Sequence, residues 1–326
     1  MPHLLEVQGL TTVFAGDYGK NISVDHIDFH VKEGEVVCLV GESGCGKSVT
    51  SLSIMGLLRK DGAVKDGSVL FDGKNLLSMT EKELDQVRGN EITMIFQDPL
   101  TSLNPVFTVG NQIVESIRTH MHLSKEDAKK RAQMLLEKVG MPDARGTMKK
   151  YPHTLSGGMR QRVMIAMALS CSPRLLIADE PTTALDVTIQ AQIMKLLKEL
   201  QEETGMSMIL ITHDIGLVAN MADRVLVMYA GQIIEEAPVK ELFENPKHPY
   251  TKALLDTVPT IRDAADRQLV SIPGMVPESY DDRKGCRFAE RCKYRRPECD
   301  NPQKDYVFGA HHTAKCIVMK EGGAEL

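Results

Sequence analysis

GESGCGKS, residues 41–48, is the stretch from which the fold of this chain follows. It matches the pattern G-x-x-x-x-G-K-[ST], whose glycines let backbone N–H groups turn inward around phosphate oxygens. The apolar run 34–40 before it predicts a buried strand, and the run 48–59 after it predicts a helix. Phosphate binding needs a loop in this context, because the helix N-terminus adds the positive end of its dipole. The stretch therefore predicts a phosphate-binding loop in an α/β protein.

The side chains of this loop indicate how a nucleotide would bind. Lys47 can reach the β- and γ-phosphates, and Ser48 offers its hydroxyl to Mg²⁺. Cys45 is expected to be a tolerated small residue rather than a redox switch. We expect nucleotide contacts from Gly41, Ser43, Gly44, Cys45, Gly46, Lys47, Ser48 and Val49.

The run LLIADE, residues 175–180, predicts a buried strand that ends in two carboxylates. Asp179 would hold Mg²⁺ through water, and Glu180 would orient and polarise the attacking water. Orienting that water is the main task of the protein in phosphoryl transfer besides stabilising charge. The alternative is a solvated strand end, which is common for isolated Asp-Glu pairs but less so after a phosphate loop. Local sequence alone thus predicts a P-loop nucleoside triphosphatase.

Composition places limits on the remaining functions. The chain has 326 residues, of which 42% are hydrophobic and 25% charged, as in an ordinary globular protein of two domains or of one with an appendage. A net charge of −5 argues against a protein devoted to nucleic acid. No run approaches the roughly 20 apolar residues that cross a bilayer, so contact with a membrane would need a partner. The seven cysteines are not expected to form a disulfide framework.

The order of apolar and polar segments predicts α/β architecture. Residues 98–170 are mostly helical in pattern, with a capped helix opening at Ser124. From about residue 237 the texture becomes Pro-rich and irregular, which places a domain boundary near 236–245. Further predicted elements are strands at 174–179 and 207–214, a helix at 187–205, and a hairpin over 224–236 that turns at Ala230-Gly231.

LSGGMRQR, residues 155–162, resembles the signature sequence of ABC-transporter ATPases, and the order of other motifs agrees. Within this resemblance, Gln97 corresponds to the Q-loop, Asp186 to the D-loop and His213 to the switch histidine. Tyr18 stands where the family places an aromatic ring against adenine, with Phe14 as the alternative. The resemblance covers about residues 4–236.

The resemblance implies a P-loop ATPase core with an antiparallel β subdomain and a helical subdomain at about 98–170. It also implies a head-to-tail dimer, in which ATP is held between the phosphate loop of one subunit and the signature of the other. A helix start that presents a hydroxyl and backbone N–H groups suits a γ-phosphate. The implied catalytic residues are Glu180, His213 and Gln97, and those near Mg²⁺ are Ser48, Gln97 and Asp179. The residues that would face the partner's ATP are Leu155, Ser156, Gly157, Gly158, Gln161 and Asp186.

NPKHPYTKALLDTVP, residues 245–259, resembles the C-terminal segment of peptide-importer ATPases, and 96–105 and 179–193 are also typical of that subgroup. The resemblance implies an ATPase subunit at the cytoplasmic face of the membrane that powers import of dipeptides or oligopeptides. Implied partners are a second ATPase (a paralogue in preference to a copy), two transmembrane permease subunits and an extracytoplasmic peptide-binding protein. Import of nickel or another small solute is the alternative within the subgroup. His248-Pro249-Tyr250 itself is expected to be a rigid turn that packs one aromatic ring onto the core.

Four cysteines lie in the tail with the spacing C-x5-C-x6-C-x16-C, which is neither a usual zinc-finger nor a bacterial ferredoxin pattern. The resemblance implies that they ligate a 4Fe–4S cluster, and structural Zn²⁺ or free thiols are the alternatives. We expect a nucleotide-binding domain over 1–240 and an irregular, cysteine-containing domain over 241–326. The four cysteines are Cys286, Cys292, Cys299 and Cys316.

A nucleic-acid-binding tail on a non-transport ABC ATPase is the rival function from another class. Lys and Arg outnumber acidic residues over 283–299, and this excess could instead offset the negative charge of a thiolate-bound cluster. Only Phe288 and Tyr294 interleave with these charges, and no recognised nucleic-acid motif accompanies them. We therefore expect no nucleic-acid partner.

Overall fold

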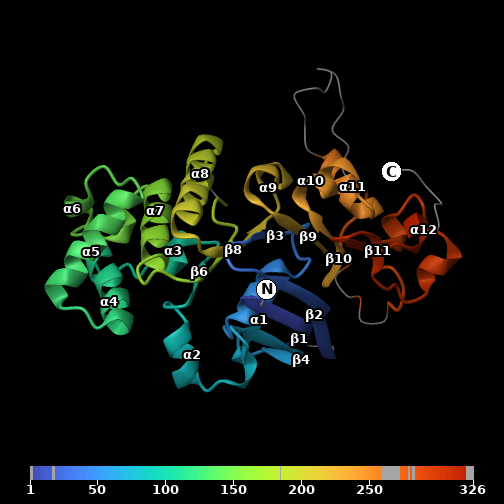
Figure 1. The fold of residues 1–326 in the computed structure, drawn as a ribbon, viewed down its shortest axis with the longest axis horizontal. Helices are drawn as coiled ribbons and strands as arrows, with labels where there is room; N and C mark the ends of the chain where they lie inside the picture. Colours follow the sequence, from blue (N-terminus) through green and yellow to red (C-terminus); the bar gives the residue numbers. More distant parts are fainter. Residues whose placement is uncertain are drawn as a thin grey trace. The chain divides into compact units, whose positions relative to one another are not determined.

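The computed structural model describes residues 3–16, 19–183, 185–257, 272–277, 280 and 283–320. These residues fold into two compact units (Figure 1). The signature unit comprises residues 32–35 and 78–211, and the loop unit comprises the described parts of 2–31, 36–77 and 212–326. The predicted phosphate loop and the whole described tail thus belong to the same unit.

One sheet of the loop unit begins with β3 (Val36–Val40), the buried strand that precedes the phosphate loop. β3 pairs in parallel with β9 (Arg224–Tyr229), and β9 pairs with β10 (Gln232–Pro238) as the predicted hairpin. β12 (His312–Ala314) continues the sheet beyond β10, and β11 (Tyr306–Gly309) pairs with β12. The tail is therefore more regular than its irregular sequence texture predicts.

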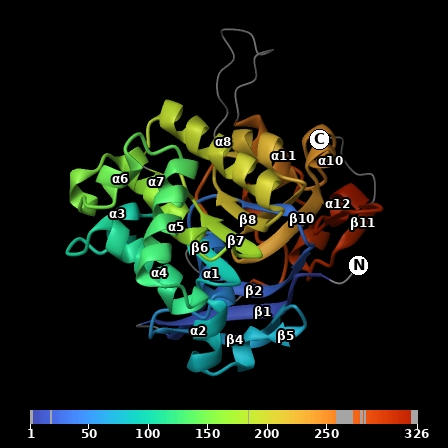
Figure 2. The same ribbon diagram turned by 60° about the vertical axis from the view of Figure 1, so that its left-hand side comes forward.

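A second sheet of the loop unit is antiparallel, in the order β2-β1-β4-β5. Figure 2 shows β1, β2 and β4 side by side. This second sheet agrees with the antiparallel β subdomain that the family resemblance implies. The strands are β1 (Leu5–Gly16), β2 (Gly19–Val31), β4 (Gly62–Phe71) and β5 (Lys74–Asn75).

Helix α1 (Lys47–Ile54) follows the phosphate loop but is shorter than the prediction of 48–59. Gly56 has a φ of 62°, in the left-handed region, and it ends the helix just after the C-cap Met55. The apolar residues beyond this stop therefore do not continue the helix. The remaining helices of the unit are α9 (Ile215–Met221), α10 (Val239–Glu244), α11 (Pro249–Asp256) and α12 (Ile317–Lys320), with 3-10 turns at Leu76–Ser78, Ala289–Arg291 and Pro297–Asp300.

The signature unit contains three parallel strands, β6 (Ile92–Ile95), β7 (Leu175–Asp179) and β8 (Ser207–Thr212), paired β6 to β7 and β7 to β8. Every residue of β7 and β8 is buried. A parallel strand covered on both faces reads as a continuous apolar run, which is why both were predictable.

Helices form the rest of the signature unit, and those between residues 98 and 170 make up the predicted helical stretch, drawn in green in Figure 1. Ser124 caps one of them by accepting a hydrogen bond from Asp127 N at 3.1 Å, as predicted. None of the helices in the described part of the chain is long and apolar enough to span a bilayer. The helices are α2 (Glu81–Val87), α3 (Pro99–Ser102), α4 (Val109–Met121), α5 (Lys125–Lys138), α6 (Ala144–Thr147), α7 (Gly157–Ala168) and α8 (Val187–Thr204), with a 3-10 turn at Pro152–Thr154.

Candidate functional site

The phosphate loop has a backbone that only glycine adopts readily. Gly44 and Gly46 have φ values of 80° and 107°, in the left-handed region. A Cβ atom on Gly46 would lie 2.5 Å from the carbonyl oxygen of Ser23, so the loop also packs too closely there for a side chain. Gly44 meets no atom within 4 Å and is exposed, so it borders open space where a phosphate can lie.

The ammonium group of Lys47 lies inside this loop. Its Nζ donates to the carbonyl oxygens of Gly41 (2.9 Å) and Glu42 (3.0 Å), and the residue is 5% exposed. A buried ammonium whose partners are neutral carbonyls is ready to exchange them for phosphate oxygens, which bind it more strongly. Burial raises the pKa of the Cys45 thiol, which disfavours the reactive thiolate.

Glu180 in the signature unit receives two hydrogen bonds on one carboxylate oxygen. Gln97 Nε2 donates to Glu180 Oε2 at 2.9 Å, and Thr183 Oγ1 donates to the same atom at 2.8 Å. The preceding residue, Asp179, is buried at the end of β7. The structure thus brings together Gln97 and Glu180, which were predicted from motifs far apart in the sequence. Thr183 was not predicted, although its position three residues after Glu180 is a local signal.

The predicted signature residues lie at the start of α7. Ser156 caps the helix by accepting a hydrogen bond from Met159 N at 3.4 Å, and Asp186 caps α8 by accepting one from Ile189 N at 2.9 Å. Both capping residues line one hollow of about 540 Å³. Its lining residues are Gly140, Pro142, Ser156, Gly157, Gly158, Met159, Arg162, Leu185, Asp186 and Ile189. The signature and the D-loop therefore form a single surface.

Two other predicted signature residues, Leu155 and Gln161, are buried and are not among the residues lining the hollow. His213, in the loop unit, is exposed directly after β8. Ser48 and Val49 are half-buried at the start of α1. Tyr18, predicted to contact adenine, lies outside the described residues.

The four tail cysteines lie near one another, and all are free thiols. Cys299 and Cys316 are buried in one apolar cluster, against which Cys286 packs. Burial, followed by the neighbouring cysteines, raises the pKa of Cys286 to about 12, and the pKa of Cys316 is raised to about 11, chiefly by burial. In the described part of the chain, no group of three or more His, Cys, Asp or Glu side chains has the arrangement that holds a metal ion. The thiols converge without forming a closed single-ion site.

The His-Pro-Tyr turn begins α11 and packs its aromatic ring onto the core, as predicted. Tyr250 is fully buried, with its ring centroid 4.7 Å from that of Tyr229 and 5.4 Å from that of Phe288. Its hydroxyl accepts a hydrogen bond from the backbone N–H of Glu42 at 2.9 Å. No signal in the sequence predicted this contact with the phosphate loop.

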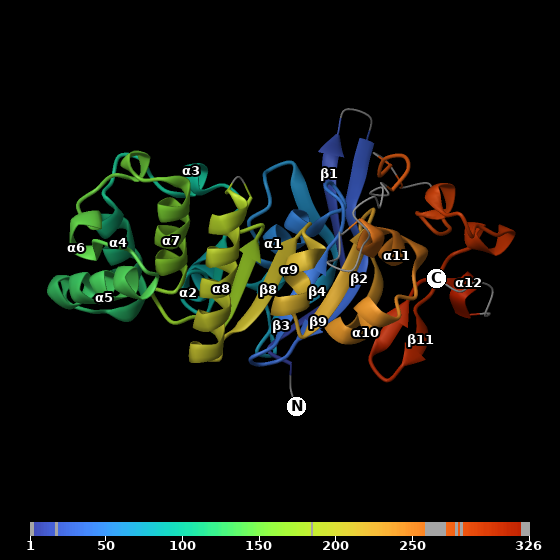
Figure 3. The same ribbon diagram turned by 90° about the horizontal axis from the view of Figure 1, so that it is seen from above.

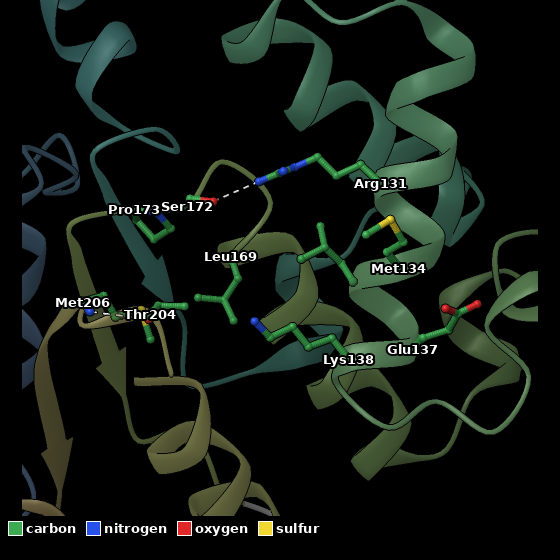
Figure 4. Close-up of a pocket in the computed structure, with 10 residues that line it drawn as sticks. Arg131, Met134, Glu137, Lys138, Leu169, Ser172, Pro173, Thr204 and Met206 are labelled. Carbon is green, nitrogen blue, oxygen red and sulfur yellow. Dashed lines mark hydrogen bonds between the residues drawn. The ribbon is translucent and has the colours of Figure 1, made fainter. Parts of the chain in front are cut away.

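A separate cavity of about 480 Å³ lies in the signature unit (Figure 4). Arg131 extends along it and donates from Nη2 to Ser172 Oγ at 2.9 Å. None of the predicted nucleotide or signature residues lines it. Its other lining residues are Met134, Leu135, Glu137, Lys138, Leu169, Pro173, Thr204 and Met206.

Comparison with known proteins places these features in a family context. The ABC transporter family pattern matches residues 24–183, and the oligopeptide/dipeptide transporter C-terminal region matches 234–299. The chain is 51% identical to the oligopeptide transport ATP-binding protein AppD of Bacillus subtilis, over 100% of this chain and 99% of that protein. It is 50% identical to a putative peptide import ATP-binding protein of Brucella melitensis, over 98% of each chain.

Solved structures agree with this likeness. A dimeric bacterial ABC transporter cassette is 29% identical, with a TM-score of 0.65 over 72% of this chain and 98% of that chain. The same identity, TM-score and coverage hold for a dimeric post-hydrolysis state of an ATP-binding cassette bound to ADP and Pi.

Proposed function

The chain belongs to the ABC transporter family, among the ATP-binding proteins of peptide import, and we propose that its ATP hydrolysis powers import of dipeptides or oligopeptides. The observation that carries this conclusion is a complete phosphate loop on a chain whose entire length matches such proteins. The match of the tail to the oligopeptide/dipeptide transporter C-terminal region favours peptides over nickel or another small solute. The proposed domains are residues 1–240, which bind nucleotide, and the C-terminal 241–326.

The residues of this chain divide the work of hydrolysis between binding and orientation. Lys47 and the inward N–H groups of the loop hold the β- and γ-phosphates, and Glu180 orients the attacking water and takes up its proton. Gln97 and Thr183 fix the direction of the Glu180 carboxylate through their hydrogen bonds. His213 contacts the γ-phosphate, and Tyr18 packs against adenine. Mg²⁺, for which Ser48, Gln97 and Asp179 offer the oxygen ligands it prefers, would neutralise phosphate charge when bound.

Two exposed surfaces of the chain, the signature hollow and the helical subdomain, support our proposals about its partners. We propose that a second ATPase, a paralogue in preference to a copy, completes each ATP site, because the signature hollow presents Ser156 and helix N–H groups outward. Two transmembrane permease subunits would bind the helical subdomain, where Val106 is 71% and Phe107 49% exposed. An extracytoplasmic peptide-binding protein would deliver substrate. The chain would lie peripherally on the cytoplasmic face of the membrane.

We propose separately that Cys286, Cys292, Cys299 and Cys316 hold a 4Fe–4S cluster. Their convergence supports this, because four thiols would offer the soft ligands that such a cluster prefers. Anaerobically purified chain should contain iron and acid-labile sulfide in equal amounts, and replacing one of the four cysteines with serine should lower both. Colourless protein with stoichiometric zinc would move the assignment to Zn²⁺. Metal-free protein with four titratable thiols would exclude both.

Peptide-dependent ATP hydrolysis by the complex with its permeases tests the proposed function. Lys47→Ala in this chain should abolish its ATP binding and the uptake of a labelled peptide into vesicles. Uptake of labelled nickel, competed by unlabelled nickel and not by peptide, would instead support the alternative solute. Peptide uptake that survives loss of ATP binding in both ATPase subunits would refute the proposal.

A further inference from the structure

Glu42, the second residue of the phosphate loop, is held from two sides by the C-terminal part of the chain. Its backbone N–H donates to Tyr250 Oη at 2.9 Å. Its two carboxylate oxygens accept hydrogen bonds from the two terminal nitrogens of Arg291, at 2.7 and 3.0 Å. Main chain and side chain of the same loop residue are thus fixed by residues more than 200 positions away.

The guanidinium of Arg291 is itself fixed in place. Its side chain is only 7% exposed, against 28% for that of Glu42. Its Nε donates to the carbonyl oxygen of Pro273 at 2.8 Å, and Nη1 donates to Tyr229 Oη at 3.2 Å. It also lies 5.8 Å from the ring centroid of Phe288. A two-pronged, charge-assisted pair with both partners anchored is among the stronger polar contacts in proteins.

The Tyr250 hydroxyl is equally well positioned. The turn that carries Tyr250 is closed by His248 Nδ1, which accepts a hydrogen bond from Tyr250 N at 3.1 Å. Burial raises the pKa of Tyr250, so the phenol stays neutral. A buried hydroxyl on a rigid turn offers the Glu42 N–H a fixed acceptor.

A second arginine ties the same tail segment to the turn that contacts the middle of the loop. Arg287 is hydrogen-bonded to Asp25 and to the carbonyl oxygen of Ala230. The neighbour of Ala230, Gly231, donates its N–H to the carbonyl oxygen of Cys45 in the phosphate loop at 2.9 Å. The segment that begins at Cys286 and ends at Cys292 therefore contacts Glu42 directly, and it reaches Cys45, in the middle of the phosphate loop, through Ala230 and Gly231. Figure 3 shows α11, the helix that carries Tyr250.

We propose that two stretches of the C-terminal region, 248–250 and 286–292, hold the phosphate loop in its nucleotide-binding conformation. Tyr250 and Arg291 are the positioning residues. A loop rich in glycine loses much conformational entropy when it closes on phosphate. Contacts that fix Glu42 beforehand reduce that cost and thereby raise nucleotide affinity. The proposal rests on the proposed function in that the loop binds ATP, but its effect on the free loop can be measured without ATP.

The test compares full-length Arg291→Met and Glu42→Gln chains, and their double variant, with wild type and a matched control, Arg295→Met. Arg295 lies in the same segment but pairs with Asp300 at an exposed position, so Arg295→Met removes a similar ion pair away from the loop. Two quantities are measured: the Kd for a non-hydrolysable ATP analogue with Mg²⁺, and amide hydrogen exchange of residues 41–48 without nucleotide.

Arg291→Met should weaken nucleotide binding about tenfold, within the range of coupling between distinct sites, and should speed exchange in the loop. Arg295→Met should change neither quantity. Because Arg291 acts through Glu42, the double variant should bind nucleotide no more weakly than either single variant. Additive losses would instead indicate that Arg291 contacts the nucleotide directly, and would overturn the proposal.

Unchanged loop exchange and unchanged Kd in a folded Arg291→Met chain would also overturn it. If that variant fails to fold, Arg291→Lys and Tyr250→Phe take its place. The first keeps the positive charge but loses the two-pronged guanidinium, and the second keeps the aromatic ring but loses the hydroxyl that accepts the Glu42 N–H. Both should speed exchange of the loop. Wild-type protein that does not bind the ATP analogue would refute the proposed function, whereas loss of loop protection in Arg291→Met would still support the positioning role.

Discussion

Glu180 has a strained backbone conformation and a side chain whose carboxylate is fixed by hydrogen bonds. Its φ of 45° lies in the left-handed region, which costs a non-glycine residue energy and recurs at functional sites. Gln97 and Thr183 direct its carboxylate through the two hydrogen bonds on Oε2. A carboxylate fixed at a strand end can orient water without reorganising during the reaction.

Glu180→Gln should separate binding from hydrolysis. The amide keeps the shape of the side chain but cannot take up a proton from the attacking water, so turnover by the assembled transporter should fall about 10²- to 10⁴-fold. The affinity of the chain for ATP should stay within about twofold, because the phosphate loop is unchanged. Single-turnover hydrolysis and equilibrium ATP binding measure the two effects. Near-normal hydrolysis would remove Glu180 from its assigned role.

His248 should make stability depend on pH. Burial lowers its pKa to about 3, from 6.5 in the unfolded chain. Between these values the unfolded chain binds a proton that the native chain does not, so the free energy of unfolding falls as pH is lowered through this range. The loss by pH 5 is about 2 kcal/mol.

His248→Asn should remove this pH dependence while keeping the cap, because an Asn side chain can also accept the Tyr250 N–H. The difference between variant and wild-type free energies of unfolding cancels the contributions of other groups. Urea denaturation at pH 8 and pH 5 measures it. Parallel pH profiles for the two proteins would exclude His248 as the titrating group.

At the scale of elements, short sequence signals predicted the helix ends and tight turns that local backbone chemistry determines. Helix α8 ends at Gly205, whose φ of 69° is the left-handed conformation expected of a helix stop. The hairpin turns at Ala230-Gly231, as its sequence predicts. The short strands β11 and β12 were missed because three or four residues carry too little periodicity. The pairing of β12 with β10 is set by long-range contacts.

The attachment of β12 to β10 depends on a buried polar cluster. Glu235 is 1% exposed and accepts hydrogen bonds from the backbone N–H groups of Lys247 (2.6 Å) and His248 (2.8 Å). His312 Nε2, in β12, is hydrogen-bonded to the same carboxylate at 2.7 Å. One carboxylate of β10 thus links the turn before α11 to β12, which lies 77 residues beyond Glu235 in the sequence.

His312→Leu should therefore loosen the tail. Removing one partner of a buried carboxylate costs about 1–3 kcal/mol, because the oxygen keeps its desolvation penalty. Hydrogen exchange at residues 306–314 should accelerate more than exchange in β1 and β2. Exposed His311, replaced in the same way, is the control. Equal exchange in the two variants would show that the cluster does not hold β12.

At the scale of the molecule, motifs predicted the residues that we propose to act on the nucleotide, whereas the residues that contact and support them came only from the fold. Glu180 was found from the apolar run that ends in two carboxylates, and Gln97 from the family resemblance. Neither inference needs spatial information. Arg291 and Tyr250 were not found in this way, since nothing local in the sequence states that a distant side chain contacts residue 42. Such support lies in long-range packing, which single-sequence patterns do not encode.

Ser156→Ala should affect the partner's site rather than this chain's own. The Ser156 hydroxyl and the first N–H groups of α7 border an exposed hollow, where they can serve a γ-phosphate held by another subunit. The variant chain alone should bind ATP with wild-type affinity, yet complexes that contain it should hydrolyse ATP at least about tenfold more slowly at the shared site. Wild-type chain alone should hydrolyse ATP poorly, with specific activity rising with protein concentration as pairs form. Robust hydrolysis by a demonstrated monomer, unaffected by Ser156→Ala, would mean that one chain suffices and that the signature serves no partner.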